Sequence, residues 1–438
     1  MSEKNGTTRR EFLKTALKGA GVAAVAAIGL PSIVPSTVFG ATAPSNRITM
    51  GFVGLGRGGG FVQHYMKRPD VKILAVCDVQ KGRAQGYADE VNGEYKSKDC
   101  TAYSDFRELI ARDDVDTVLV YTPTHWHAII AVAALNAGKD TFCEKPLALT
   151  IKEGRAICDA VKRNNRVFLA GTQYRTYPDW QNGVEVVRNG LIGKLKQVMV
   201  QGGGGIFPDV DHTFPASIPV SPDFDYNFWL GPSPEVPYFG QTIMVNWMAC
   251  ADYATGWLTE FSVHSMDNAL WGYNPRWEGI VEVEGKGVYY SDPRLDTPKT
   301  FEAELRFPDG VVMPFGSNLG EKGCRGNVMF TGTDGWAGMG KNATSSSVGL
   351  FRPTSTQWRA DQQLLGRDFI DCVRSRKTPY ATAEECHRAT SLIIVTDIAM
   401  RLGRKLRWDL ATEQFVGDDE ANRMLSRPMR SPWRLVGA

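Results

Sequence analysis

The sequence lacks the patterns that mark metal-binding and disulfide-stapled proteins. It has no His-Glu-x-x-His pattern, no EF-hand loop and no Cys-x-x-Cys pair, and its eight cysteines are scattered. Several cysteines fall inside apolar strand or helix patterns. We therefore expect buried thiols and no metal site.

The sequence also lacks a large excess of either positive or negative charge. Lysine and arginine together number 50, aspartate and glutamate 48, and no basic block breaks this balance. Nothing therefore indicates a nucleic-acid partner. The 438 residues, 43% hydrophobic and 22% charged, are enough for two domains with a large core.

The first 43 residues differ from the rest of the chain. Thr-Arg-Arg-Glu-Phe-Leu-Lys begins at Thr8, an uncharged Gly/Ala/Val-rich stretch follows over residues 19–30, and Pro31 ends it. This order is typical of a secretory signal and resembles a twin-arginine signal. The alternative is a short amphipathic helix or a membrane helix, and a membrane-spanning helix needs about 20 apolar residues. We expect residues 1–43 to be a signal, cleaved or kept as a tether, that sends the protein through the twin-arginine export machinery to the periplasm or another extracytoplasmic location.

Short β-rich runs alternate with helical patterns between residues 48 and 170. The expected strands are 48–55, 71–76, 115–121, 141–143 and 167–170, and the expected helices are 60–67, 81–91, 105–111, 128–137 and 151–163. This alternation predicts βαβ units and a doubly wound parallel sheet, the Rossmann arrangement. Ligands of such sheets bind at the carboxyl ends of the strands.

A glycine-rich loop follows the first expected strand. Gly54-Leu55-Gly56-Arg57-Gly58-Gly59 fits G-x-G-x-x-G and opens a helix. In this motif Gly54 permits the tight turn, Gly56 lets the backbone approach a pyrophosphate, and Gly59 lets the helix pack close to the strand. Asp78 ends the second strand and would accept hydrogen bonds from ribose hydroxyls. Because a carboxylate there repels a 2′-phosphate, NAD is favoured over NADP.

Three further motifs carry a family resemblance. They are Thr-Pro-Thr-His-Trp-His from Thr122 to His127, Glu-Lys-Pro from Glu144, and Glu-Phe-Ser-Val-His-Ser-Met-Asp from Glu260 to Asp267. With the glycine loop they resemble the Gfo/Idh/MocA oxidoreductases, in their signal-bearing bacterial branch, over residues 47–433. The resemblance implies a Rossmann domain at 44–170, an α+β domain at 171–405 with an open, mainly antiparallel sheet, and a C-terminal tail at 406–438. That sheet commonly joins the subunits of a homo-oligomer.

The second half of the sequence agrees with this outline. Strands are expected at 196–201, 277–283, 300–307 and 311–315, and helices at 360–373 and 383–401.

The resemblance also implies the catalytic residues. Lys145 matches the lysine that hydrogen-bonds the reacting oxygen, and His264 matches the catalytic base or its close helper. Glu260 lies four residues before His264, so on one helix both share a face and the carboxylate would orient the imidazole. The family normally has Asp and Gly where this chain has Glu260 and Ser262, a departure that places ordinary dehydrogenation in question.

Other candidate residues surround these. We expect cofactor contacts from the glycine-loop residues Gly54, Gly56, Arg57 and Gly59 with Asp78, and from Thr122, Pro123, His127, Glu144, Lys145 and Gln173. Substrate contacts are expected from Tyr174, Arg175 and Asp267. Simple packing is the alternative for Tyr174, and a helix contact without chemistry is the alternative for His127.

The sequence therefore predicts an NAD(H)-dependent oxidoreductase of a sugar, polyol or glycoside. Soluble NAD is not supplied outside the cytoplasm, so we expect a tightly bound nucleotide. Two alternatives stay open. One is an NAD-recycling glycoside hydrolase or lyase that works through a transient keto-sugar, with Tyr174 or Tyr177 as the C–H base. The other is a non-catalytic sugar-binding protein of the same fold.

Overall fold

The computed structural model describes residues 46–204, 216–240, 246–320, 322–324, 327–340, 345–346 and 369–435. The predicted signal and residues 360–368 of a predicted helix lie outside this part of the chain. All eight cysteines lie within it, and they are buried and free of disulfides. No helix in the described ranges is long and apolar enough to cross a membrane.

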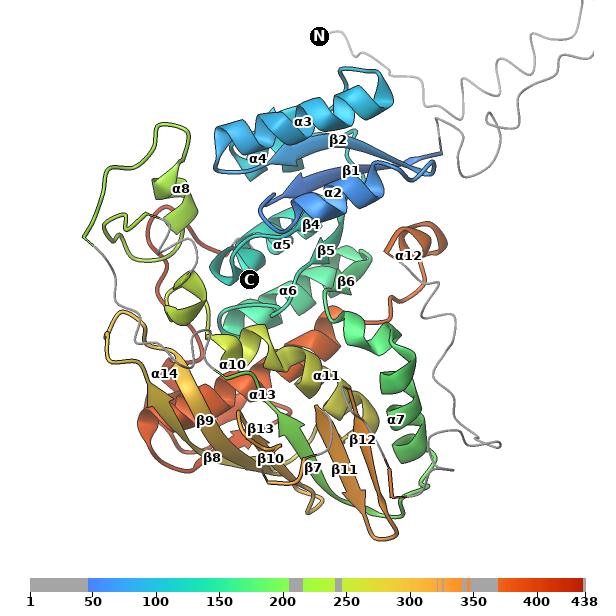
Figure 1. The fold of residues 1–438 in the computed structure, drawn as a ribbon, viewed down its shortest axis with the longest axis vertical. Coiled ribbons are helices and arrows are strands. Elements are labelled where there is room, and N and C mark those ends of the chain that lie inside the picture. The colour runs from blue at the N-terminus through green and yellow to red at the C-terminus, as the bar shows by residue number, and fades with distance from the viewer. Residues whose placement is uncertain are drawn as a thin grey trace, which may run out of the picture. The chain divides into compact units, whose positions relative to one another are not determined.

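The first sheet has six parallel strands in the order β3-β2-β1-β4-β5-β6 (Figure 1). Its strands are β1 Ile48–Val53, β2 Val71–Cys77, β3 Thr101–Tyr103, β4 Thr117–Val120, β5 Asp140–Cys143 and β6 Phe168–Ala170. Helices α2 Gly59–Tyr65 and α3 Lys81–Tyr95 cover one face, and α4 Phe106–Ile110, α5 His127–Asn136 and α6 Ile151–Asn164 cover the other. The doubly wound parallel fold is confirmed, and the strand order reverses between β1 and β4.

The second sheet has eight strands in the order β12-β11-β7-β10-β9-β8-β13-β14. They are β7 Leu195–Gln201, β8 Ile280–Tyr289, β9 Pro298–Arg306, β10 Val312–Gly316, β11 Val328–Gly332, β12 Trp336–Met339, β13 Leu406–Asp409 and β14 Gln414–Phe415. Only β7 and β10 pair in parallel, so the mainly antiparallel sheet is confirmed.

Three element predictions need correction. The edge strand β3 was missed because it has only three residues, none of them buried. Strand β8 starts and ends later than the predicted 277–283, because its pairing with β9 continues to Tyr289. Strands β13 and β14 extend the second sheet and α14 Asp419–Arg423 follows them, so the first part of the predicted tail at 406–438 is sheet.

Helices fill the space between the two sheets (Figure 1). They include α10 Trp257–Glu260, α11 Ser262–Tyr273 and α13 Ala383–Leu402, while α7 Pro178–Arg188 packs beside α11 and α12 Phe369–Ser375 precedes α13. A capping box between Thr382 and Glu385 begins α13. Most of α13 is buried on every side, because it packs against α6, α11 and β8.

The end of the chain returns to the first domain. The indole of Trp433 packs edge-on against Trp126, with ring centroids 4.7 Å apart, and against Phe228 at 5.2 Å. Phe228 belongs to α8 Tyr226–Leu230, and its ring in turn stacks on Trp126. Arg430 donates hydrogen bonds to the carbonyl oxygens of Asn227 and Gly231. The last described residues are therefore a fixed part of the fold.

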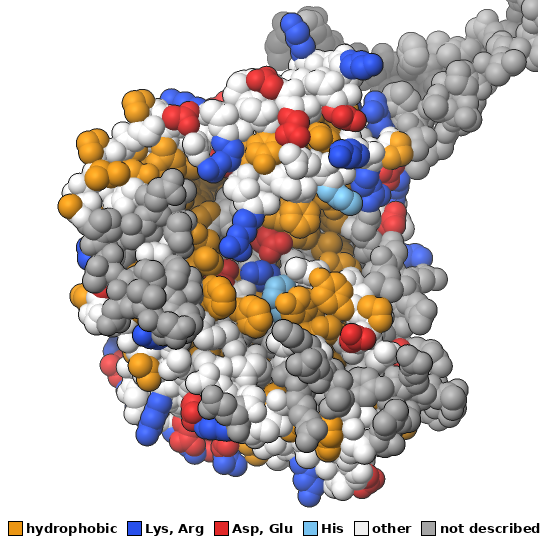
Figure 2. Space-filling model, in the orientation of Figure 1, with side chains coloured by type: hydrophobic (Ala, Val, Ile, Leu, Met, Phe, Trp, Pro, Cys, Tyr) orange, Lys and Arg blue, Asp and Glu red, His pale blue; other side chains and the backbone are white. Residues whose placement is uncertain are grey.

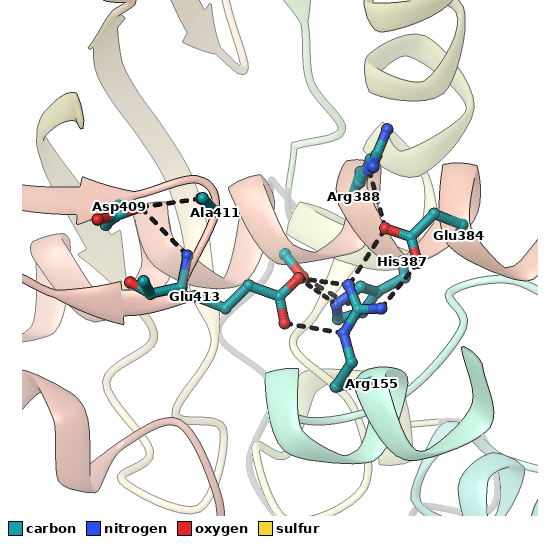
Figure 3. A network of polar contacts seen from close by, with 9 residues as sticks. Arg155, Glu384, His387, Arg388, Asp409, Ala411 and Glu413 are labelled. Atoms are coloured by element: carbon teal, nitrogen blue, oxygen red, sulfur yellow. Dashed lines mark hydrogen bonds and ion pairs between the residues drawn. The ribbon is translucent and has the colours of Figure 1, made fainter. Parts of the chain in front are cut away.

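A network of charged side chains ties α6 to α13 and to the β13–β14 turn (Figure 3). The Arg155 guanidinium binds Glu413 at 2.6 Å and Glu384 at 2.8 Å. His387, which is 1% exposed, lies 2.9 Å from the same Glu413 carboxylate. Burial raises the pKa of Glu413, but the hydrogen bonds from His387 and Arg155 outweigh it and lower that pKa to about 2.

The low pKa of Glu413 predicts a pH-dependent stability contribution. The ordinary pKa of 4.5 applies to the unfolded chain, which therefore binds more protons than the folded chain as pH falls from about 5 to 2. We expect Glu413→Gln to lower the free energy of unfolding by about 2 kcal/mol at pH 7, a difference that shrinks below pH 4.5. Urea unfolding across this range tests it.

The matched control is Glu420→Gln, which removes an exposed carboxylate paired with Arg404. It should change the stability by less than about 0.5 kcal/mol at every pH. A loss in Glu413→Gln that stayed constant from pH 7 to pH 3 would contradict the assigned pKa.

Candidate functional site

The glycine loop lies at the carboxyl end of β1, where the strand order reverses. Gly54 has φ +88°, and a Cβ on it would lie 2.6 Å from the carbonyl oxygen of Tyr121 after β4. A Cβ on Gly59 would lie 1.9 Å from the hydroxyl of Tyr87 on α3. We predicted that this glycine lets α2 pack close to a strand, but it lets α2 pack close to α3 instead. Gly56 has no neighbour within 4 Å of its Cβ position. The backbone at Gly56 is therefore open to a pyrophosphate, as the motif requires.

Asp78 follows β2 and faces the glycine loop. Its carboxylate accepts hydrogen bonds from the backbone N–H groups of Leu55 and Gln80, both at 2.8 Å. The side chain of Arg83 lies 3.4 Å away. The two backbone N–H groups and the two long contacts from Arg83 take up about four acceptor positions, so a ribose hydroxyl would bind here by replacing a contact from Arg83. This geometry fits the predicted cofactor role.

The end of β4 supplies Thr122 and Pro123. The Oγ1 of Thr122 is buried and has no hydrogen-bond partner in the described part of the protein. An orphaned buried hydroxyl next to the glycine loop fits a polar group of a bound dinucleotide.

His127 has a different role from the cofactor contact that we predicted. Its Nδ1 lies 2.8 Å from the carbonyl oxygen of Pro146, and its Nε2 lies 2.9 Å from that of Thr122. Burial lowers the pKa of His127 to about 4, so the ring is neutral. A neutral imidazole has one N–H, so it donates to one of these carbonyl oxygens while the other lies against the second ring nitrogen. His127 therefore packs between the loops after β4 and β5, and neither ring nitrogen is open to a ligand.

Lys145 follows β5 and reaches across to the second domain. Its Nζ donates a hydrogen bond to the carbonyl oxygen of Glu260 at 2.7 Å and lies 3.8 Å from the Glu260 carboxylate. The neighbouring Glu144 accepts a hydrogen bond from the backbone N–H of Lys145 at 3.1 Å, and burial raises the pKa of Glu144. Lys145 has three donor hydrogens, so two remain for a ligand.

Glu260 does not orient His264, contrary to our prediction. Helix α10 ends at Glu260 and α11 begins at Ser262, so the two residues do not share one helix face. The Glu260 carboxylate instead accepts a hydrogen bond from Thr124 at 2.6 Å. Ser262, where the family normally has glycine, accepts one from the backbone N–H of Gly203 at 2.9 Å.

His264 lies on α11, where its ring stacks on that of Tyr174 with centroids 4.3 Å apart. The residue is 6% exposed, and its Nδ1 has no hydrogen-bond partner among the described residues. Burial, helped by the positive charge of Lys145, lowers the pKa of His264 to about 3. The imidazole is therefore neutral near pH 7 and able to accept a hydrogen bond at Nδ1.

Arg175 and Asp267 pair with each other, which corrects their predicted role as substrate contacts. Their side chains meet through two hydrogen bonds of 2.7 and 2.8 Å, and they are 4% and 0% exposed. Arg175 also binds Glu385 at 2.7 Å. No donor or acceptor of this pair faces open space, so it is a structural clamp. Gln173, in the same turn, is exposed.

Together these residues form one polar cluster at the junction of the two domains. Burial raises the pKa of Glu260, and the charges of Lys145 and Arg57 oppose that rise, which places all three groups near one another. Figure 2 shows a hollow on this face with Lys or Arg, Asp or Glu, and His side chains on its floor. Within the described ranges, no group of three or more His, Cys, Asp or Glu could hold a metal ion.

One contact escaped sequence reasoning. Thr124 belongs to the motif from Thr122 to His127, but nothing in the sequence indicated that its hydroxyl donates a hydrogen bond to Glu260, 136 residues later. A separate cavity of about 530 Å³ lies beside the Arg155 network, and none of the predicted site residues lines it. Four of its five charged residues, Arg155, Glu384, Arg388 and Glu413, pair with one another. The candidate site is therefore the polar cluster that contains Lys145, Glu260 and His264.

Two family models match the chain. The model described as "Oxidoreductase family, NAD-binding Rossmann fold" matches residues 48–172, and the one described as "Oxidoreductase family, C-terminal alpha/beta domain" matches residues 179–435.

The sequence is also similar to glycosidase-named proteins. It is 33% identical over 201 residues to a glycosyl hydrolase family 109 protein of Shewanella pealeana, and 30% identical over 201 residues to an alpha-N-acetylgalactosaminidase of Shewanella oneidensis. Each match covers 43% of this chain and 44% of the relative, so the chain spans less than half the length of these relatives.

Among solved structures, a levoglucosan dehydrogenase in complex with NADH and levoglucosan resembles this chain with a TM-score of 0.57. The likeness covers 83% of this chain and 100% of that one, at 17% identity, and shows the fold alone.

The clamp assignment predicts a large loss of stability in Arg175→Met. Asp267 would be left buried without its partner, which typically costs about 3–5 kcal/mol. Urea unfolding should show this loss, and Asp267→Asn added to the variant should restore part of it. Arg276→Met, at an exposed ion pair, should change the stability by less than about 0.5 kcal/mol. Unchanged stability in Arg175→Met would return Arg175 to the substrate site.

Proposed function

Since this chain belongs to the Gfo/Idh/MocA oxidoreductase family, we propose that it is an NAD(H)-dependent oxidoreductase that acts on a sugar, polyol or glycoside. One observation carries the proposal. Lys145 follows β5, and its positive charge acts on the buried imidazole of His264, whose Nδ1 has no hydrogen-bond partner among the described residues. A cation and a neutral base are the two groups that removal of a hydroxyl proton needs.

The glycine-loop backbone at Gly56, the Asp78 carboxylate and Thr122 would hold the cofactor, whose nicotinamide would supply hydride acceptance and return. Asp78 favours NAD over NADP by charge repulsion. Tight binding follows from the proposed location, because an exported enzyme has no soluble pool from which to replace its nucleotide.

The protein residues handle the proton. Lys145 donates a hydrogen bond to the substrate oxygen and stabilises the negative charge that develops there. His264 Nδ1 takes the hydroxyl proton while the carbon loses its hydride, so that the alcohol becomes a carbonyl. Burial, helped by the charge of Lys145, lowers the pKa of His264 and keeps the imidazole neutral before this step.

A second candidate function is redox-neutral cleavage of a glycoside. The names of the Shewanella relatives support it, since they describe glycosidases. A transient ketone would acidify the neighbouring C–H, a leaving group would depart, and water and hydride would return. Tyr174 or Tyr177 would move that proton. The stacking of Tyr174 on His264 supports Tyr174, and burial raises the pKa of Tyr174. The third candidate, a non-catalytic sugar-binding protein, rests on the changed residues Glu260 and Ser262.

We further propose that residues 1–43 direct the folded protein through the twin-arginine machinery to the periplasm, where the signal is cleaved or serves as a tether. The Arg9-Arg10 pair and the uncharged stretch after it support this proposal.

We also propose that copies of the chain associate through the second sheet. Helices α11 and α13 cover one face of this sheet. The exposed side chains of Glu284, Lys286 and Val288 alternate along β8 with partly buried residues, and so lie on the other face. A sheet face of this kind suits a symmetric contact between identical chains.

The catalytic proposal predicts lost turnover with retained nucleotide in Lys145→Met and His264→Asn. Each change should lower kcat by at least about 100-fold. The first measurement is the NAD(H) and NADP(H) released when the purified protein is denatured, followed by turnover on a panel of sugars and aryl glycosides. Aryl-glycoside cleavage without net NADH formation would identify the redox-neutral reaction.

Lys152→Met is the matched control, because this exposed lysine of α6 lies beside the separate cavity. It should retain normal turnover. Full turnover in both site variants would remove Lys145 and His264 from the mechanism. A wild-type protein that binds neither NAD nor NADP would overturn the proposed function.

The export proposal predicts that Arg9→Lys with Arg10→Lys keeps the protein in the cytoplasm, because the route reads the arginine pair. Cell fractionation and immunoblotting measure the distribution. Lys14→Arg keeps the pair and should still be exported. Normal export of the double variant would exclude this route.

A further inference from the structure

Helix α3 begins without a cap of its own. Its N-cap residue Gln80 makes no side-chain capping hydrogen bond, and its first turn holds no acidic residue. The first N–H groups are satisfied by Asp223, far along the chain. Its carbonyl oxygen accepts from Lys81 at 2.9 Å, and its carboxylate accepts from Gly82 at 2.7 Å. The cap of α3 therefore comes from the second half of the chain.

Neighbouring bonds fix Asp223 in this position. Phe224 pairs with Gln80 in a short antiparallel bridge, and the N–H of Asp225 donates to the carbonyl oxygen of Val79 at 2.9 Å. Residues 221–225, which we call the strap, thus lie along the β2–α3 loop just before α8. The loop joined to the strap directly follows Asp78, the residue assigned to the cofactor ribose.

The same place holds the elements of a phosphate site. Lys81 and Gly82 offer N–H groups at the start of a 15-residue helix. Arg83 lies 3.4 Å from Asp78, and Lys81 is exposed. A dinucleotide with a 2′-phosphate would place that phosphate beside the Asp78 ribose position, next to these groups. Here Asp223 already occupies both N–H groups: its backbone carbonyl oxygen accepts from Lys81, and its carboxylate accepts from Gly82.

We propose that Asp223 is a specificity-determining residue, which excludes a 2′-phosphate from the start of α3 and so selects NAD over NADP. The inference rests on the proposed dinucleotide site and adds a second carboxylate to it. Asp78 repels a 2′-phosphate from the ribose side. Asp223 repels it by charge and also removes the N–H donors that would otherwise bind it.

The variant Asp223→Asn tests this inference on the full chain. The amide keeps an oxygen that can cap Gly82, so the charge is lost with little change in shape. Calorimetric titration with 5′-AMP and 2′,5′-ADP isolates the adenosine end, and NAD and NADP are then titrated in the same way. We expect AMP and NAD affinities to stay within about threefold, while those for 2′,5′-ADP and NADP rise about tenfold.

Ionic strength gives a second readout. The gain in 2′,5′-ADP affinity should shrink from about 0.05 M to 0.5 M salt, because the effect is one of charge. Asp225→Asn is the matched control, since this strap carboxylate caps α8 through the N–H of Phe228. It should leave the AMP to 2′,5′-ADP preference unchanged. Thermal melting checks that both variants fold. Asp223→Ser is a second variant that removes the same negative charge with a different side chain.

Two results would overturn the inference while leaving the proposed function intact. One is a wild-type protein that binds 2′,5′-ADP as tightly as 5′-AMP. The other is an unchanged preference in folded Asp223→Asn and Asp223→Ser. A wild-type protein that binds no dinucleotide at all overturns both the inference and the proposed function, so the two failures are distinguishable.

Discussion

The buried guanidinium of Arg175 holds together the elements on which the geometry of the site depends. It pairs with Asp267 on α11 and with Glu385 at the start of α13, while Arg175 itself lies in the turn that carries Tyr174. Asp267 and His264 are three residues apart on α11, so fixing one fixes the direction of the other. The stacking of Tyr174 on His264 follows from the same anchor. A charge buried this deeply is stable only while all of its partners stay in place.

The reactive groups come from two domains, and each domain positions the residue of the other. Lys145 follows a strand of the first sheet, yet its ammonium is held by the backbone of Glu260 in the second domain. Glu260 is held in turn by Thr124 of the first domain. This reciprocal arrangement brings a positive charge close to a neutral imidazole, a pair that would drift apart if either domain moved alone. The polar contacts of Arg155 and of the strap provide further ties between the domains.

Local pattern was enough to predict five of the six strands of the first sheet, the character of the second sheet, and the family. Parallel strands that are covered on both faces appear in the sequence as apolar runs. Such runs come just before the glycine loop, Asp78 and the Glu144-Lys145 pair. The two family models confirm the membership that these motifs indicated. The partners of side chains were harder to predict. The helix break at Phe261 separates Glu260 from His264, and the buried pair of Arg175 and Asp267 looked like two free polar groups because 91 residues lie between them. Asp223, the carboxylate that caps α3, likewise lies 141 residues from Gly82 in the sequence, so no local pattern could predict this contact.

The packing of Trp433 has a consequence for the order in which the protein is made. The first domain is synthesised first, and its sheet and helices are complete by residue 170. Yet Trp433, which packs against Trp126, is made much later. A nascent chain therefore leaves part of the aromatic surface around Trp126 uncovered until Trp433 has been made, because contacts of such long sequence separation form late. The packing of the first domain is thus completed only after the second domain has been synthesised.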